Sequence, residues 1–189
     1  GHHAALQHIS SDYHLVLNPD AELDEQALTA GLRCLQAQPD AVLVSPQVRG
    51  DNGEQEFLCK RYPSVLVLFL RAFAPTSMQK PFARRLAHYQ MEDVCAGDDV
   101  VPVPLASGCC MLIRSTDLRQ VGGFDERYFL YFEDFDLSLR LAQRGRLLFA
   151  PAMRIVHHGG YAAGKGLAHV GYFIRSGLRF FNQHGWRWI

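Results

Sequence analysis

Residues 13–24 read YHLVLNPDAELD, and this stretch decides the fold class of the chain. Leu15 to Leu17 form a short apolar run that is typical of a buried strand. Pro19 ends the run, because proline cannot donate a hydrogen bond to a sheet. Asp20 therefore stands at the carboxyl end of a strand, where ligands bind in open α/β sheets. We expect Asp20 to contact a metal ion or a phosphate, although Asn-Pro-Asp is also common turn chemistry.

A second group of carboxylates lies in YFEDFDL, residues 131–137. Glu133, Asp134 and Asp136 stand in the first turn of a predicted helix, where acidic side chains complement the helix dipole, so stability alone could explain them. The aromatic residues around them favour a second interpretation. Apolar walls raise the pKa of a carboxylate, as a general base near neutral pH requires.

A later strand-like run, residues 153–156, ends in His157-His158. Adjacent side chains of an extended segment point to opposite sides, so at most one of the two imidazoles faces a given site. We take His157 as the candidate. Carboxylates and an imidazole delivered from separate strand ends are typical of a metal-assisted site.

The loop after these histidines, Gly159 to Lys165, matches the start of a phosphate-binding P-loop. Gly166 stands where that motif needs Ser or Thr to hold magnesium, which argues against a true P-loop. We interpret the segment as a glycine-rich loop beside an anionic ligand, with Lys165 able to reach a phosphate.

Strand-like and helix-like segments alternate along the chain, which indicates an α/β fold. Residues 76–101 show no clear core pattern, and we expect a long loop with a short helix there. The other predicted elements are a strand at 14–17, a helix at 24–38 with Asp24 as N-cap, a strand at 41–45, a hairpin turn at 51–53, a strand at 109–113, a short helix capped by residues 115–117 that stops at Gly122-Gly123, a helix at 133–144 and the strand at 153–156.

Composition limits the functional classes. The 189 residues suit a single domain. Nineteen basic and nineteen acidic side chains give no net charge, so a nucleic-acid partner is not expected. Five cysteines without C-x-x-C spacing favour free thiols in a reduced, cytosolic compartment. The aromatic and basic segment 170–189 fits either packing on the domain or contact with a membrane surface.

Four stretches together resemble the family 2 glycosyltransferases of GT-A fold, in particular their rhamnosyltransferase-like branch. They are YHLVLNPDAELD (13–24), ASGCCMLIR (106–114), VGGFDERYFLYFEDFDLSLRLAQRG (121–145) and RIVHHGG (154–160). The resemblance implies a mixed sheet flanked by helices, in one domain over residues 1–189 with a helical C-terminal segment at 167–189.

The resemblance also implies roles for single residues. Asp134 resembles the catalytic base, with Glu133 beside it. Asp20 resembles the last acid of the metal- and diphosphate-binding motif, and Asn18 takes the place of its first Asp. The remaining implied roles are a metal or diphosphate contact for His157, with Mn²⁺ or Mg²⁺ as the ion, and an acceptor-side position for Ser107, Gly108 and Asp125.

The implied reaction is inverting transfer of a sugar, with rhamnose as the first candidate, from a nucleoside diphosphate to a polysaccharide or lipid-linked glycan. Contact with the inner face of the cell membrane would suit such an acceptor. Family members begin with a strand, a helix and a further strand whose acid holds the nucleotide base, whereas this chain opens at Gly1-His2-His3, which resembles the helix after that unit. We therefore expect a fragment with weak or no activity and with an exposed sheet edge that favours pairing with another copy.

Two other functional classes remain open at this point. A metal-dependent phosphoesterase would use the same carboxylates and His157. A non-catalytic carbohydrate-binding or assembly module would keep the fold without the chemistry.

Overall fold

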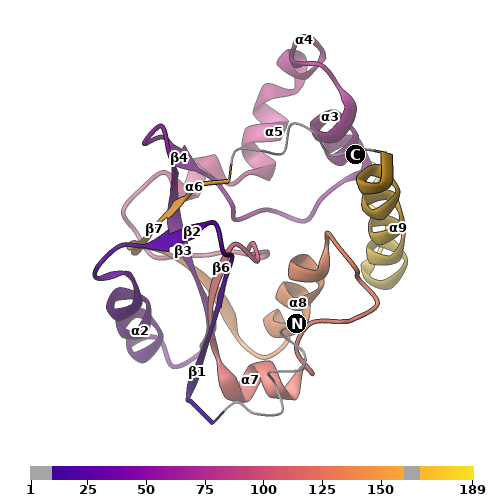
Figure 1. Ribbon diagram of the computed structural model, residues 1–189. Coiled ribbons are helices and arrows are strands. Elements are labelled where there is room, and N and C mark those ends of the chain that lie inside the picture. The colour runs from indigo at the N-terminus through magenta and orange to yellow at the C-terminus, as the bar shows by residue number, and fades with distance from the viewer. Residues whose placement is uncertain (1–9, 160–166) are drawn as a thin grey trace.

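The computed structural model describes residues 10–159 and 167–189 and has a mixed seven-stranded sheet at its centre (Figure 1). The strands are β1 (Tyr13–Leu17), β2 (Ala21–Leu23), β3 (Ala41–Gly50), β4 (Gln55–Glu56), β5 (Val101–Pro102), β6 (Cys110–Arg114) and β7 (Arg146–His157). Around them lie α2 (Ala27–Ala37), α3 (Val65–Phe73), α4 (Thr76–Gln79), the 3-10 turn η1 (Lys80–Phe82), α5 (Ala83–Tyr89), α6 (Glu92–Cys95), α7 (Ser115–Gln120), α8 (Glu133–Ala142) and α9 (Leu167–His184).

The strand order is β1-β6-β3-β7-β2, with β4 paired to β3 and β5 paired to β7. Only β3 and β7 run parallel among these pairs of the described chain; the others are antiparallel. The predicted mixed α/β class is confirmed. The predicted strand at 41–45 continues five residues further, and the strand at 153–156 is the second half of a longer β7.

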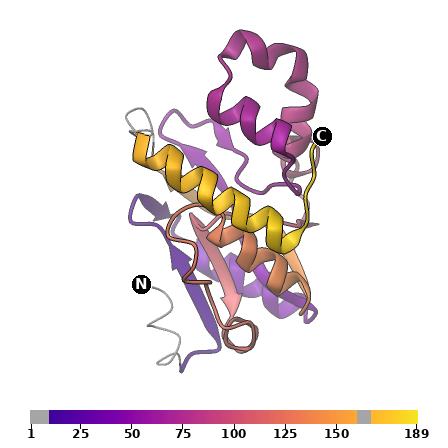
Figure 2. The ribbon, with the colours of Figure 1, turned by 90° about the vertical axis from the view of Figure 1, so that its right-hand side faces the viewer.

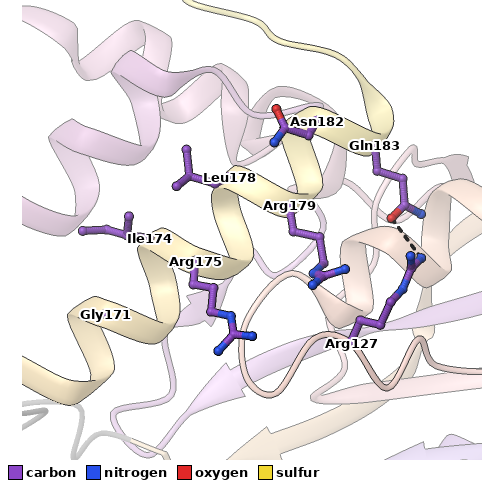
Figure 3. Close-up of a pocket in the computed structure, with 8 residues that line it drawn as sticks. All are labelled: Arg127, Gly171, Ile174, Arg175, Leu178, Arg179, Asn182 and Gln183. Atoms are coloured by element: carbon purple, nitrogen blue, oxygen red, sulfur yellow. Dashed lines mark hydrogen bonds between the residues drawn. The ribbon is translucent and has the colours of Figure 1, made fainter.

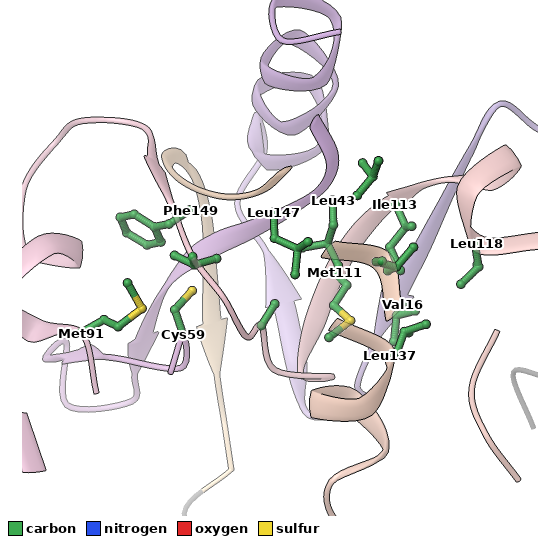
Figure 4. Packing of buried hydrophobic residues seen from close by; sticks show 14 of the residues in the cluster. Val16, Leu43, Cys59, Met91, Met111, Ile113, Leu118, Leu137, Leu147 and Phe149 are labelled. Carbon is green, nitrogen blue, oxygen red and sulfur yellow. The ribbon is translucent and has the colours of Figure 1, made fainter. Parts of the chain in front are cut away.

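Side chains of the central strands alternate between two hydrophobic cores, because successive residues of a strand point to opposite faces. Leu43 and Leu147 lie in one core, shown in Figure 4, where α8 contributes Leu137. Val44 and Leu148 lie in the other core, which α2 covers. The sheet is therefore covered on both faces, and the strand ends remain available for a site.

A helical lobe formed by α3, α4, η1 and α5 stands beside the sheet (Figure 1). The expectation of a long loop with a short helix over residues 76–101 was wrong, because most of this stretch is helical. Leu86 and Tyr89 of α5 are buried against Val67 and Leu70 of α3. This packing supplies the core that the local sequence pattern does not reveal.

Helix α9 lies across the outer side of α8 (Figure 2). Phe180 and Phe181 of α9 are buried in one cluster with Tyr128 and Phe132, which precede α8. No helix among the described residues is long and apolar enough to cross a membrane.

Two predicted helix caps were wrong. α2 begins at Ala27, and the Asp24 backbone carbonyl accepts a hydrogen bond from the Ala27 N–H in a turn before the helix. α7 begins at Ser115 without a side-chain cap, and the Ser115 hydroxyl is buried without a partner in the described chain. The predicted stop at Gly122-Gly123 is confirmed, because both glycines have positive φ.

Candidate active site

The first group of polar side chains gathers where β1 and β7 end. Asp20 Oδ2 lies 3.6 Å from His157 Nε2, and His157 Nδ1 lies 2.9 Å from Glu56 Oε2. β4 carries Glu56 to this place through the hairpin at 51–53, which the sequence predicted. In the tautomer that carries its hydrogen on Nδ1, His157 donates to Glu56 and turns the lone pair of Nε2 toward Asp20.

This donor set fits a divalent ion that also binds substrate phosphates. Asp20 Oδ2 and His157 Nε2 lie 3.6 Å apart, close enough for one ion to contact both atoms. The Glu56 carboxylate orients the imidazole. A Cβ added to Gly159 would lie 2.5 Å from His157 Nε2 and 2.9 Å from Asp20 Oδ2, so only glycine leaves this space open. Over residues 10–159 and 167–189, no three His, Cys, Asp or Glu side chains form a complete metal cage. Substrate phosphates and water can supply further ligands to such an ion.

His158 faces a different set of acids. Its Nδ1 lies 2.6 Å from Asp51 Oδ1 and its Nε2 lies 3.2 Å from Glu22 Oε2. These carboxylates raise the pKa of His158, Asp51 more than Glu22. The two adjacent histidines thus point to opposite sides, and His157 is the one beside Asp20.

The second group of polar side chains forms at the N-terminal end of α8. Asp134 Oδ2 accepts a hydrogen bond of 3.0 Å from the Gly108 N–H, and Oδ1 accepts one of 2.9 Å from the Phe135 N–H. One turn later, the Ser138 hydroxyl accepts from the Ala106 N–H at 3.1 Å. The segment before β6 and the first turns of α8 therefore hold each other and fix the Asp134 carboxylate.

The residues just before this helix have an uncommon backbone. Tyr131 and Phe132 have φ values of 68° and 65°, a left-handed conformation that disfavours side chains. Phe132 is held there by its burial against Phe180, with ring centroids 5.4 Å apart, and the Tyr131 hydroxyl lies 3.1 Å from His169 Nδ1. Strained backbone of this kind clusters at functional sites, where packing maintains it.

A cavity of about 700 Å³ opens in front of Asp134. Its walls come from α3, from the start of α8 and from the first turns of α9. Lys60 and Arg71 supply positive charge to it, and both approach the ring of Tyr89, at 6.0 Å and 5.4 Å from its centroid. Lys60 is buried and donates a hydrogen bond to the Phe57 carbonyl.

Three ionisable side chains of this cavity, Glu133, Asp134 and Lys60, have shifted pKa values. Burial, and then the charge of Asp134, raise the pKa of Glu133 to about 7, and its Oε2 is buried without a hydrogen-bond partner in the described chain. Burial raises the pKa of Asp134, while hydrogen bonds from the Gly108 and Phe135 N–H groups oppose the rise. Burial, and then the charge of Arg71, lower the pKa of Lys60 to about 7. Glu133 and Lys60 can therefore exchange protons near neutral pH.

The two groups are joined by the segment at 107–109. Asn18 N–H donates to the Cys109 carbonyl at 2.9 Å, and the charges of Asp20 and Glu56 add to the burial that raises the pKa of Cys109 to about 12. Its neighbour Gly108 binds Asp134. The Asp20–His157 group and the Asp134 group thus lie on either side of one short turn.

Two curated proteins match most of the chain in sequence. The chain is 31% identical over 156 residues to the N-acetylglucosaminyl-diphospho-decaprenol L-rhamnosyltransferase of Mycobacterium tuberculosis, covering 82% of this chain and 49% of that protein. It is 28% identical over 152 residues to the rhamnosyltransferase WbbL of Escherichia coli, covering 78% of this chain and 52% of that protein. The chain is a homologue of rhamnosyltransferases. It spans about half the length of these curated relatives, and no family model matches it.

A solved structure shares the fold. GalNAc-T7, crystallised with UDP, GalNAc and Mn²⁺, superimposes with a TM-score of 0.60 at 13% identity, over 95% of this chain and 33% of that protein. The expected GT-A fold is confirmed.

Other predicted residues of this rhamnosyltransferase homologue have different surroundings. Ser107 lines the cavity with Asp134. Asp125 lies in the loop before α8, does not line the cavity and binds the Arg127 guanidinium, with Oδ2 2.6 Å from Nη2. Lys165 lies outside the described residues.

Four residues of the site were missed by sequence reasoning. Glu56 follows the predicted hairpin turn, so the hairpin was a signal that it returns toward the strand ends. Lys60, Arg71 and Tyr89 carry no such signal, because each reads as an ordinary surface or core residue until the lobe packs against the sheet.

A wider groove of about 760 Å³ lies on the outer face of α9 (Figure 3). Arg175 and Arg179 extend into it from α9, and Arg127 faces them from the loop before α8, where it also contacts Gln183. None of the carboxylates of the two groups above lines this groove. The groove therefore lies apart from both groups of carboxylates.

Proposed function

We propose that this domain transfers a sugar from a nucleoside diphosphate to an acceptor hydroxyl with inversion at the anomeric carbon. The observation that carries the proposal is the pairing of a fixed carboxylate, Asp134, with a separate Asp20–His157 set across one turn. The first group suits proton removal, and the second suits a diphosphate with its counter-ion.

The proton acceptor in this proposal is Asp134. Its carboxylate faces the cavity, is anchored by Gly108 and has a raised pKa, as a general base near neutral pH requires. As an acceptor hydroxyl attacks the anomeric carbon, its proton passes to Asp134 and the bond to the nucleoside diphosphate breaks on the opposite face. Attack opposite to the leaving group inverts the configuration.

Asp20 and His157 would hold a divalent ion, Mn²⁺ or Mg²⁺, with Glu56 orienting the imidazole. Such an ion, when bound, offsets the negative charge that develops on the departing diphosphate. The solved structure of GalNAc-T7 was obtained with both UDP and Mn²⁺, which supports this assignment. Asn18 lies at the same strand end as Asp20, and Lys165, eight residues after His157 in the sequence, is a further candidate for contact with the phosphates.

The name of the mycobacterial relative suggests L-rhamnose as the sugar and a lipid-linked diphosphate glycan as the acceptor. In that reaction Ser107 and Gly108 would border the acceptor, and Lys60 and Arg71 would face its negative charge from the cavity wall. Asp125, bound to Arg127, would act by shaping the loop before α8.

Calorimetry with UDP and with thymidine diphosphate tests the donor half of the proposal. We expect binding that requires Mn²⁺ and that weakens at least about tenfold in Asp20→Ala, because a carboxylate ligand of the ion is lost. Glu22→Ala is the matched control, since Glu22 lies two residues away and contacts His158. Binding that ignores Mn²⁺, or an equal loss in both variants, would reject the assignment of Asp20.

A further inference from the structure

The segment that builds the helical lobe has an unusual charge composition. Residues 57–91 contain six Lys or Arg side chains and no Asp or Glu, although the whole chain has equal numbers of both signs. Three of these cations, Lys80, Arg84 and Arg85, are exposed on η1 and α5. Within the described residues none of the three forms an ion pair, so their charge faces solvent.

The same lobe exposes large apolar side chains. Phe69 is 51% exposed, Phe73 48% and Met78 54%, and Phe82 adds a fourth such residue beside the cations. Phe69 and Phe73 stand one helical turn apart on α3 with ring centroids 5.9 Å apart, so they form one aromatic surface. Apolar groups on this scale usually mark an interaction surface.

Exposed aromatic and Met side chains together with unpaired cations are the features of a surface that lies in a membrane interface. The apolar groups enter the boundary between headgroups and acyl chains, and the cations bind anionic headgroups. The absence of carboxylates from residues 57–91 removes the repulsion that an anionic surface would otherwise meet. We propose that the helical lobe, residues 65–89, docks on an anionic lipid bilayer.

The position of the cavity agrees with this orientation. Leu68, Ala72 and Phe73 of α3 form part of its wall, and Phe73 is also half exposed on the lobe. The cavity in front of Asp134 therefore opens next to the proposed docking surface. A bilayer on the lobe would bring a lipid-borne acceptor to the mouth of the cavity.

Vesicle co-sedimentation tests the proposal on the chain as it stands. We expect binding to phosphatidylcholine vesicles that contain phosphatidylglycerol, weaker binding to vesicles of phosphatidylcholine alone, and a decrease as salt rises. Two variants, Arg84→Glu/Arg85→Glu and Phe69→Ser/Met78→Ser, should each bind the vesicles at least about tenfold more weakly than the unchanged chain. None of these four residues lines the cavity.

The matched controls lie on α2, which covers another part of the sheet (Figure 1). Arg33→Glu changes an exposed cation, and Leu28→Ser changes an apolar side chain that is 42% exposed. Both should bind vesicles as the unchanged chain does. Should the apolar lobe variant fail to fold, the charge variant at two exposed positions still decides the matter.

Three results would overturn the proposal: no binding to either vesicle, equal binding to both vesicles, or normal binding by both lobe variants. A fourth contrary result concerns the oligomeric state, which light scattering measures. If the lobe variants convert an oligomer to a monomer and the chain ignores vesicles, the lobe is a contact between copies of the chain. Vesicle binding needs neither donor nor acceptor, so its outcome is independent of the proposed transfer reaction.

Discussion

At the scale of single residues, Asp134 is distinguished by the hydrogen bonds that fix both of its oxygens. Asp134→Asn keeps the shape but removes the proton acceptor, so we expect the rate of sugar transfer to fall about 10²- to 10⁴-fold. Binding of the nucleoside diphosphate should be unchanged, because Asp20 and His157 are untouched. Single-turnover kinetics and calorimetry on the same preparation measure the two quantities.

The control for this variant is Asp98→Asn, an exposed carboxylate in the loop before β5. It should leave both the rate and the affinity unchanged. Transfer by Asp134→Asn at the normal rate would show that another group takes the proton.

Glu133, next to Asp134, links the site to the pH dependence of stability. In the folded chain the pKa of Glu133 is about 7, whereas its ordinary value is 4.5. The folded chain therefore keeps this proton to a higher pH than the unfolded chain does. Between these pH values the folded state binds more protons than the unfolded state, so the free energy of unfolding falls as pH rises. The fall is about 1–3 kcal/mol after allowing for solvent screening.

Glu133→Gln should remove this contribution to the fall of the free energy of unfolding with rising pH. Denaturant unfolding at about pH 5 and at about pH 8 measures it, and Glu126→Gln, at an exposed position in the loop before α8, should keep the original slope. An unchanged slope in Glu133→Gln would mean that its carboxyl is already ionised in the folded chain below neutral pH.

At the scale of elements, Asp136 connects α8 to α9. It is fully buried and accepts hydrogen bonds of 2.8 Å from Arg140 Nε, Gln183 Nε2 and His184 Nε2. Removing a buried charge from such a network leaves its partners unmatched. We expect Asp136→Asn to lower the free energy of unfolding by about 2–3 kcal/mol.

The informative comparison is the same substitution two residues earlier. Asp134→Asn should cost much less stability than Asp136→Asn, because Asp134 partly faces the cavity. Thermal unfolding of both variants measures the contrast. Equal losses would mean that both Asp134 and Asp136 are structural, as the helix-dipole interpretation of the sequence allows.

The elements also show what the sequence could predict. β1 and α8 were predicted within two residues at each end, because an apolar run ended by Pro19 and the repeat of Leu137 and Leu141 are local signals. The caps at Asp24 and Ser115 were wrong, and the backbone N–H of each residue pairs with a segment distant in sequence, which local sequence does not reveal. The Asp24 N–H, for example, donates to the Arg154 carbonyl.

Some residues of the site could likewise be predicted from the sequence, and others could not. Asp20, His157 and Asp134 end or begin elements that the sequence reveals, so their positions follow from the pattern. Lys60 reaches the cavity because its N–H pairs with the Leu105 carbonyl, a contact between segments 45 residues apart that local propensity does not encode. Glu56 meets His157 across 101 residues.

At the scale of the whole molecule, the carboxylates proposed for the chemistry and the arginines proposed for membrane docking lie on different elements, although α3 of the lobe also lines the cavity. The carboxylates of the site belong to strand ends and to α8, whereas Arg84 and Arg85 belong to the lobe. Substitutions of Arg84 and Arg85, which do not line the cavity, should therefore leave the chemistry at the carboxylates intact.

Arg84→Glu/Arg85→Glu tests this separation in the transfer reaction itself. With an acceptor embedded in vesicles that contain phosphatidylglycerol, transfer should slow by about tenfold, because docking concentrates the chain where the acceptor lies. With a water-soluble acceptor of the same glycan, the rate should be unchanged, since neither arginine lines the cavity. Arg33→Glu on α2 should leave both rates unchanged. If the charge variant slows both reactions equally, the lobe acts by shaping the cavity, and its exposed cations are not a docking surface.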